Sequence, residues 1–183
     1  GLFLLVPCLL VLCLLLDCRH EDRLPAGRAD PAAALLEQVD SLRAEGRYEA
    51  ALQLCEQAAD RLRPSPSWRR EDAGRQSATL EAVLGLPPDA RTALAEADRL
   101  KRDARACDGR GDSRGAAELA TRESAIRQQV LGADHYESGA SLCREAGYLC
   151  TSGDYLGAEQ AILKAEAVLL RALGGNHPET ARC

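Results

Sequence analysis

The sequence predicts an all-α fold built from antiparallel helix hairpins, and three observations support this. Aromatic residues make up only 3% of the 183 residues and Met is absent, although 46% of the chain is hydrophobic. A core of this composition is built mainly from Ala and Leu, which favours close helix-on-helix packing over a β-sandwich. Apolar residues also recur at helical spacing along most of the chain. Finally, glycine corners recur at a fixed interval, which indicates an internal repeat.

The corners that carry this repeat have the sequence Leu-Gly. Their glycines, Gly85, Gly132 and Gly174, lie 47 and 42 residues apart. Two turn glycines, Gly111 and Gly153, are also 42 residues apart, and each precedes the following corner glycine by 21 residues. Two independent landmarks therefore give the same period. Each unit is predicted to be a helix, a tight turn, a second helix and a corner.

The hairpins are expected in order along the chain. A first hairpin is predicted over residues 32–63, because Asp30-Pro31 is a favourable helix start and Gly46-Arg47-Tyr48 forms its turn. Residues 64–90 are predicted to be an irregular connection with a short helix from Ser77 to Leu84. The next segments are a second hairpin (91–131), a third hairpin (132–174) and the start of a truncated further repeat (175–183). Their helices are predicted over Thr92 to Ala106, Ala116 to Val130, Glu137 to Thr151 and Tyr155 to Ala172.

Residues 1–23 form a hydrophobic leader, and residues 24–31 form a linker containing Pro, Gly and charged residues. Leu2 to Leu16 is almost entirely apolar, but as a helix it rises only about 22 Å, which is short of the roughly 30 Å hydrocarbon core of a bilayer. A signal peptide or membrane anchor is the favoured interpretation, and a translated non-coding or mispredicted first exon is the alternative. The absence of Met predicts that the sequence is a fragment.

The charge of the sequence argues against nucleic acid as a partner. The formal net charge is −5, the pI is near 5.3, and Arg residues alternate with acidic residues instead of clustering. Nucleic acid is therefore not expected as a partner, and a membrane is expected to be contacted only through residues 2–16. Carboxylates that alternate with Arg and Lys along the helices are expected on solvated faces. They include Glu118, Glu123, Glu159 and Glu166.

No arrangement of residues typical of a catalytic, metal or cofactor site appears, so the chain is predicted not to be an enzyme and to bind no cofactor or metal. The eight Cys residues contain no C-x-x-C pair. Cys143 and Cys150 share a helix face but lie about 10 Å apart, too far for a disulfide, so the cysteines are expected to be small packing or groove residues. The corner histidines His135 and His177 are expected to be structural caps.

The turn and corner residues resemble the tetratricopeptide repeat, in the 42-residue form found in kinesin light chains. That form has a Gly-x-Tyr-x-x-Ala-Glu turn and a helix ending in Val-Leu-Gly-x-x-His-Pro-x-Thr-Ala. Residues 153–159 match the turn and 173–181 match the corner, while Tyr136 replaces the Pro of the preceding corner. The resemblance covers residues 32–181 and implies a right-handed superhelical solenoid. The signature positions are Gly46, Tyr48, Ala51, Gly111, Ala116, Ala146, Gly153, Tyr155, Ala158, Ala165, Gly174, His177 and Pro178.

In this family the first helix of each stacked hairpin lines a concave face. The resemblance therefore implies a non-catalytic scaffold that binds a partner protein or an extended peptide on that face. Cys143 and Arg144 stand where kinesin light chains usually carry a pair of Asn that belong to the peptide groove. A mixed groove with a basic centre suits an extended acidic peptide. The expected groove residues are Leu36, Asp40, Arg43, Lys101, Arg105, Asp108, Cys143, Arg144, Gly147 and Cys150.

Two other functions remain as alternatives. The array could be the regulatory repeat region of a larger enzyme or signalling protein, with the catalytic domain outside this sequence. A co-chaperone that grips carboxyl-terminal chaperone peptides is disfavoured, because that family needs Lys and Asn at the groove positions of Leu36 and Asp40. The repeat family implies a cytoplasmic protein, whereas a genuine leader implies a secreted or membrane-anchored one.

Overall fold

The computed structural model describes residues 31–62 and 67–183, and these residues form helices and no strands, which confirms the all-α class. The leader expected over residues 1–23 lies outside the described residues, as does most of the linker. Among the described helices, none combines the length and apolar composition needed to cross a bilayer. The helices are α2 (Pro31–Ala44), α3 (Tyr48–Arg61), α4 (Ser67–Leu84), α5 (Pro88–Gly109), α6 (Ser113–Leu131), α7 (Tyr136–Ser152), α8 (Tyr155–Leu173) and α9 (Pro178–Arg182).

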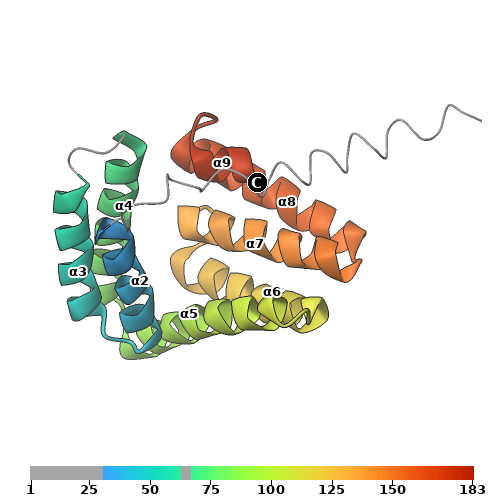
Figure 1. Ribbon diagram of the computed structural model, residues 1–183, viewed down its shortest axis with the longest axis horizontal. Coiled ribbons are helices and arrows are strands. Elements are labelled where there is room, and N and C mark those ends of the chain that lie inside the picture. Colours follow the sequence, from blue (N-terminus) through green and yellow to red (C-terminus); the bar gives the residue numbers. More distant parts are fainter. Residues whose placement is uncertain (1–30, 63–66) are drawn as a thin grey trace, which may run out of the picture.

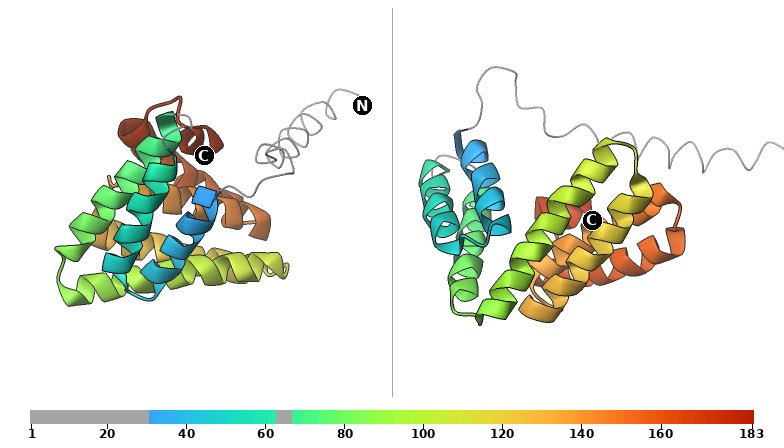
Figure 2. Two further views of the ribbon diagram at one scale, coloured as in Figure 1. Left: turned by 60° about the vertical axis from the view of Figure 1, so that its left-hand side comes forward. Right: turned by 90° about the horizontal axis from the view of Figure 1, so that it is seen from below.

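The helices form two groups, which run across each other (Figure 1). In the first group, α3 lies between α2 and α4 and packs on both. In the second, α5, α6, α7 and α8 stack in chain order, each packing on the next, and the short α9 lies against α8. The groups meet where α2 packs on α5, and the two views of Figure 2 show these helices side by side.

The 42-residue register is visible in the turns inside the second and third hairpins. Gly111 and Gly153 have φ values of 80° and 91°, in the left-handed region that favours glycine. The next residue is Asp112 in one turn and Asp154 in the other. Each carboxylate accepts a hydrogen bond from the backbone N–H three residues later, at 2.9 Å in α6 and 3.0 Å in α8. Each turn therefore contains a glycine with positive φ, followed by an Asp that caps the next helix in the same way.

The corners repeat in the same way. Gly132 and Gly174 have φ values of 96° and 83°. Three residues later, Nδ1 of His135 and of His177 accepts a hydrogen bond from the backbone N–H two positions on, at 3.2 Å in both cases. The prediction that these histidines act as caps is confirmed. Gly85, the first corner glycine, is not among the glycines with positive φ, so the first corner has a different backbone.

Helix α4 is longer than predicted. Residues 64–75 were expected to be irregular with a helix only from Ser77, but α4 begins at Ser67. The helical pattern was hidden because few of the extra residues are apolar: Ala73 is buried, and its neighbours are mainly charged. Arg75 stabilises this part of the helix through ion pairs with two acidic residues three and four positions earlier. The ends of the other predicted helices differ from the structure by four residues or fewer.

The interior contains many small side chains, in agreement with the composition. Fully or nearly fully buried alanines lie between the stacked helices, where they permit close approach of the backbones. The first group has a more varied core in which Val39, Tyr48 and Leu80 pack together with Leu94 of α5. The buried alanines of α5 to α8 are Ala95, Ala97, Ala104, Ala116, Ala117, Ala120, Ala146, Ala161 and Ala165.

Candidate functional site

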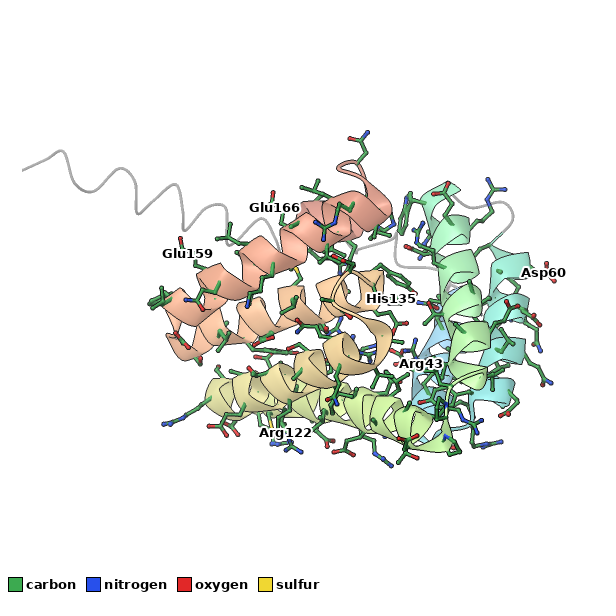
Figure 3. All side chains as sticks on the ribbon, turned by 180° about the vertical axis from the view of Figure 1, so that it is seen from behind. Arg43, Asp60, Arg122, His135, Glu159 and Glu166 are labelled. Carbon is green, nitrogen blue, oxygen red and sulfur yellow. The ribbon has the colours of Figure 1, made fainter. Side chains whose placement is uncertain are left out.

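Charged side chains are buried where helices of the two groups meet. Arg43 from α2, Asp98 from α5, Glu123 and Arg127 from α6, and Glu137 from α7 are each 8% exposed or less. We call these five residues the ionic core. Figure 3 labels Arg43, which points from α2 toward the stacked helices. The helices in this region are therefore joined by charge pairs as well as by apolar contacts.

Arg43 connects α2 to two helices of the second group. Its Nη1 and Nη2 donate to the two carboxylate oxygens of Glu137 at 2.9 and 2.7 Å, and its Nε donates to Oδ2 of Asp98 at 3.1 Å. This two-pronged geometry is the strong form of an Arg–carboxylate pair. Arg43 thus binds an acid from α5 and an acid from α7 at the same time.

Arg127 binds the same two acids from the other side. Its Nη2 donates to Oδ1 of Asp98 at 2.5 Å and its Nη1 to Oε2 of Glu137 at 2.6 Å, while its Nε donates to Oε1 of Glu123 at 2.9 Å. Arg144, at the edge of the core, donates to the same oxygen of Glu123 at 2.6 Å. Each acid of the core is therefore paired with guanidinium groups, which compensates for the loss of water.

Neighbouring positive charges stabilise the ionised form of the buried glutamates. Burial would raise the pKa of Glu137, but the positive charges of Arg43 and Arg127 outweigh it and hold the pKa well below its usual range. The same balance holds for Glu123: burial opposes ionisation, but Arg144 and Arg127 lower its pKa. Glu137 and Glu123 consequently stay ionised at neutral pH.

The expectation that Glu123 lies on a solvated face is wrong, because this side chain is 1% exposed. The other three carboxylates in that prediction, Glu118, Glu159 and Glu166, are exposed. Glu123 and Arg127 occupy the same stripe of α6 as the buried residues Ala116 and Ala120. A charged residue inside a stripe of small residues was the one sequence signal that could have revealed this burial.

The structure brings some of the expected groove residues together. The ammonium of Lys101 in α5 donates to Oδ2 of Asp40 in α2 at 2.9 Å. Burial would raise the pKa of Asp40, but Lys101, and after it Arg43 and Arg105, lower it. Burial lowers the pKa of Lys101; its partner Asp40 opposes this effect, and the nearby Arg144 adds to it. Lys101, Arg105 and Arg144 therefore place positive charge in one neighbourhood on α5 and α7.

The remaining groove residues differ in exposure. Arg105, Asp108, Gly147 and Cys150 are exposed, whereas Leu36 and Cys143 are half-buried. Arg43 belongs to the ionic core and is 6% exposed, so its guanidinium is engaged inside the protein. The sequence did not single out Asp98, Arg127 or Glu137 as site residues.

The cysteines that the structure describes form no disulfide. Cys55 is buried, and its thiol lies 3.5 Å from the carbonyl oxygen of Ala73, which agrees with a packing role. Cys143 is half-buried and Cys150 is exposed. Cys8, Cys13 and Cys18 lie outside the described residues. Within the described ranges, no group of three or more His, Cys, Asp or Glu side chains is arranged to hold a metal ion.

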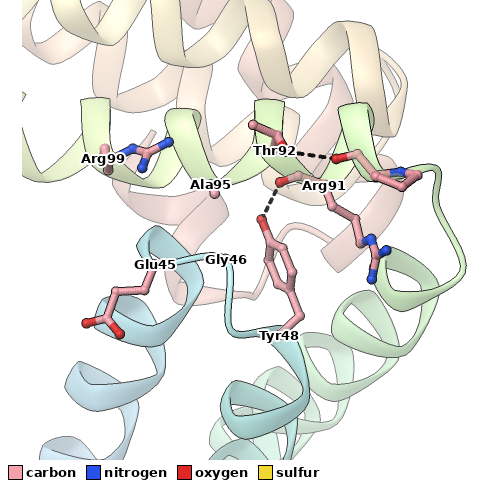
Figure 4. Close-up of a pocket in the computed structure, with 8 residues that line it drawn as sticks. Glu45, Gly46, Tyr48, Arg91, Thr92, Ala95 and Arg99 are labelled. Atoms are coloured by element: carbon pink, nitrogen blue, oxygen red, sulfur yellow. Dashed lines mark hydrogen bonds between the residues drawn. The ribbon is translucent and has the colours of Figure 1, made fainter.

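A pocket of about 430 Å³ lies between the α2–α3 turn and the start of α5 (Figure 4). The hydroxyl of Tyr48 donates to the backbone oxygen of Arg91 at 2.9 Å in its wall. Burial raises the pKa of Tyr48 to about 12, so the phenol stays protonated at neutral pH. None of the expected groove residues lines this pocket. Its lining consists of Glu45, Gly46, Tyr48, Pro88, Arg91, Thr92, Ala95 and Arg99.

No protein-family model matches the chain. No curated protein matches its sequence.

Proposed function

We propose that this chain is a section of a tetratricopeptide-type helical-repeat array, similar to that of kinesin light chains, which acts as a non-catalytic scaffold for binding proteins. The observation that carries the proposal is the repeated pair of turn and corner. Gly111 and Gly153 share one backbone conformation and one Asp cap, and Gly132 and Gly174 share a second conformation and a His cap. A hairpin repeated in this way stacks on its neighbours and presents an extended surface.

The proposed binding surface comprises the exposed parts of α5 and α7 around Lys101, Arg105 and Arg144. Lys101 and Arg105 stand four residues apart on α5 and therefore share a helix face. Arg144 of α7 is close enough to Lys101 to lower its pKa. Lys101 and Arg144 are partly engaged by acids of the chain, whereas Arg105 is exposed. An extended peptide with several carboxylates complements this charge.

Binding can be tested with a fluorescently labelled poly-glutamate peptide, by anisotropy at low ionic strength. We expect the wild-type chain to bind it and the Arg105→Glu variant to bind at least tenfold more weakly. Arg105 is the residue to change first because it is exposed, so its substitution leaves the fold intact. The double variant Lys101→Glu/Arg105→Glu should show a larger loss.

The matched control reverses two charges elsewhere. Arg114 and Arg122 are exposed on α6, outside the proposed surface. The Arg114→Glu/Arg122→Glu variant has the same net charge as the Lys101→Glu/Arg105→Glu variant, so both lose the same long-range attraction. If both weaken binding equally, the effect comes from net charge and the proposed surface is rejected. Equal binding of a labelled poly-lysine peptide would also count against it.

A further inference from the structure

Helix α8 carries a stripe of exposed leucines on its outer side. Leu156, Leu163 and Leu170 are 67%, 60% and 44% exposed and are spaced seven residues apart. Seven residues are nearly two helical turns, so the three side chains lie in line along the helix. The buried residues Ala165 and Leu169 lie on the opposite side of α8. We call these three leucines the α8 stripe.

Stacking of the repeat does not account for this stripe. The positions 42 residues earlier, on α6, are Arg114, Thr121 and Gln128. Arg114 and Thr121 are exposed, although α7 packs on α6. In the preceding hairpin these positions are thus polar, and the next helix leaves two of them uncovered. A further hairpin packed on α8 in the same way would leave the outer side of the helix open.

The charges beside the stripe are arranged by sign. At about 100° per residue, Glu159 and Glu166 fall on one flank of the leucines, and Lys164 and Arg171 fall on the other. All four side chains are exposed. Figure 3 shows Glu159 and Glu166 projecting from the outside of α8. In a coiled-coil heptad with the leucines at position d, these acids occupy position g and these bases occupy position e.

We propose that a second copy of this chain covers the α8 stripe, with the two α8 helices side by side and parallel. In a parallel pair, position g of one helix faces position e of the other, five residues further along. Glu159 then faces Lys164 of the second copy, and Glu166 faces Arg171 of the second copy. In an antiparallel pair, the acidic flanks would face each other. The charges therefore select the parallel arrangement.

The pairing is self-limiting and weak. A two-fold axis makes both copies use the same surface, so the assembly closes as a dimer instead of growing into a fibre. The stripe spans little more than two heptads, and an interface of this size falls in the class of reversible association, below about 1,200 Å². Arg171 already contacts Asp134 of its own chain, so one of the four flanking charges is shared. The dimer should accordingly form with rising protein concentration.

The first test measures the mass of the full chain by sedimentation velocity over a concentration series. We expect a monomer–dimer equilibrium that is lost in the Leu163→Lys variant. The matched control is Thr121→Lys, which places the same side chain at the corresponding exposed position of α6. Circular dichroism checks that both variants keep their helices. A wild-type chain that stays monomeric at every concentration would overturn the proposal, as would equal loss in both variants.

The second test uses charge exchange and does not depend on a leucine. Glu159→Lys/Glu166→Lys and Lys164→Glu/Arg171→Glu should each lose the dimer, because like charges face each other across the parallel interface. Mixing the two variants should restore a mixed dimer. A variant with all four charges exchanged should dimerise with itself and not with the wild-type chain. If it instead pairs better with the wild-type chain than with itself, the helices are antiparallel and the proposed arrangement is wrong.

Discussion

Arg43 in α2 holds the carboxylate of Glu137 in α7 with hydrogen bonds of 2.9 and 2.7 Å, although the two residues are 94 positions apart in the sequence. The pair joins the two groups of helices, because Arg43 comes from the first hairpin and Glu137 from the third. Asp98 and Arg127 complete the contact from α5 and α6. We infer that these directional bonds define how the first hairpin sits against the stacked helices, since a purely apolar contact would accept more than one angle.

Removal of the arginine should be strongly destabilising. In Arg43→Leu, Asp98 and Glu137 remain buried with Arg127 as their shared partner, so part of their negative charge is uncompensated. We expect a loss of about 3–5 kcal/mol in the free energy of unfolding, which is typical of a broken buried ion pair. Urea unfolding followed by circular dichroism measures it.

The matched control is Arg122→Leu on α6. The side chain of Arg122 is 64% exposed and lies 3.9 Å from Glu96, a surface contact. Such pairs contribute less than about 1 kcal/mol, and Leu is as good a helix former as Arg. If the two variants lose similar stability, the ionic core does not have the role assigned to it.

Low pH should reduce the stability of the protein by protonating its buried carboxylates. The pKa values of Glu137, Glu123 and Asp40 are lowered in the folded protein. Below the ordinary glutamate value of 4.5, the unfolded chain therefore binds more protons than the folded chain. The stabilisation is present above that pH and is lost as the pH falls toward the folded-state values. Urea midpoints measured from about pH 7 to about pH 3 should fall steeply at the acid end.

A variant separates this effect from general acid unfolding. Glu137→Gln removes the group with the strongest shift, so this variant should be less stable at neutral pH but should lose less additional stability in acid. An acid profile parallel to that of the wild-type chain would show that Glu137 does not contribute to the pH dependence.

The two Asp caps should contribute equally to the stability of the protein. Asp112→Ala and Asp154→Ala each remove one hydrogen bond to a free backbone N–H at the start of a helix, which costs about 1 kcal/mol. Because the two turns are 42 residues apart and have the same geometry, the two losses should agree closely. Asp103→Ala, at an exposed position inside α5, should be neutral or slightly stabilising. Thermal unfolding measures all three, and a large difference between the caps would argue against a common repeat.

Close packing between α7 and α8 should reject a larger side chain. Ala165 is fully buried, so Ala165→Leu should destabilise the protein by about 1–3 kcal/mol through overpacking. The same change at the exposed Ala172 on the same helix should have little effect. Comparison of the two urea midpoints tests whether the helices approach as closely as the structure indicates; a tolerated Leu at position 165 would contradict it.

The sequence predicted the parts of the fold that depend on local pattern. These parts are the turn glycines, the residues that follow them and the helical spacing of apolar residues, which are all features of a single hairpin. The ends of helices α5 to α8 were predicted to within four residues. The all-α class follows from the same patterns. Helix α4 was missed in part because its first half lacks an apolar stripe.

The ionic core could not be predicted because it depends on distant contacts. Glu123 and Arg127 stand four residues apart, the spacing of an ordinary solvated pair. They are buried because Arg127 pairs with Asp98 of α5 and Glu137 of α7. Both of these acids also bind Arg43 of α2. A pattern inside one helix carries no information about these partners, except that both residues lie in the stripe of Ala116 and Ala120.

A double-mutant cycle on Arg43 and Glu137 tests the account most directly. The free energy of unfolding is measured for the wild-type chain, Arg43→Leu, Glu137→Leu and the double variant. If the pair joins the two groups of helices inside the protein, the double variant should be more stable than the sum of the single losses predicts, by about 1–3 kcal/mol. Simple addition of the two losses would show that Arg43 and Glu137 act independently and would contradict the ionic core as the link between the first hairpin and the stack.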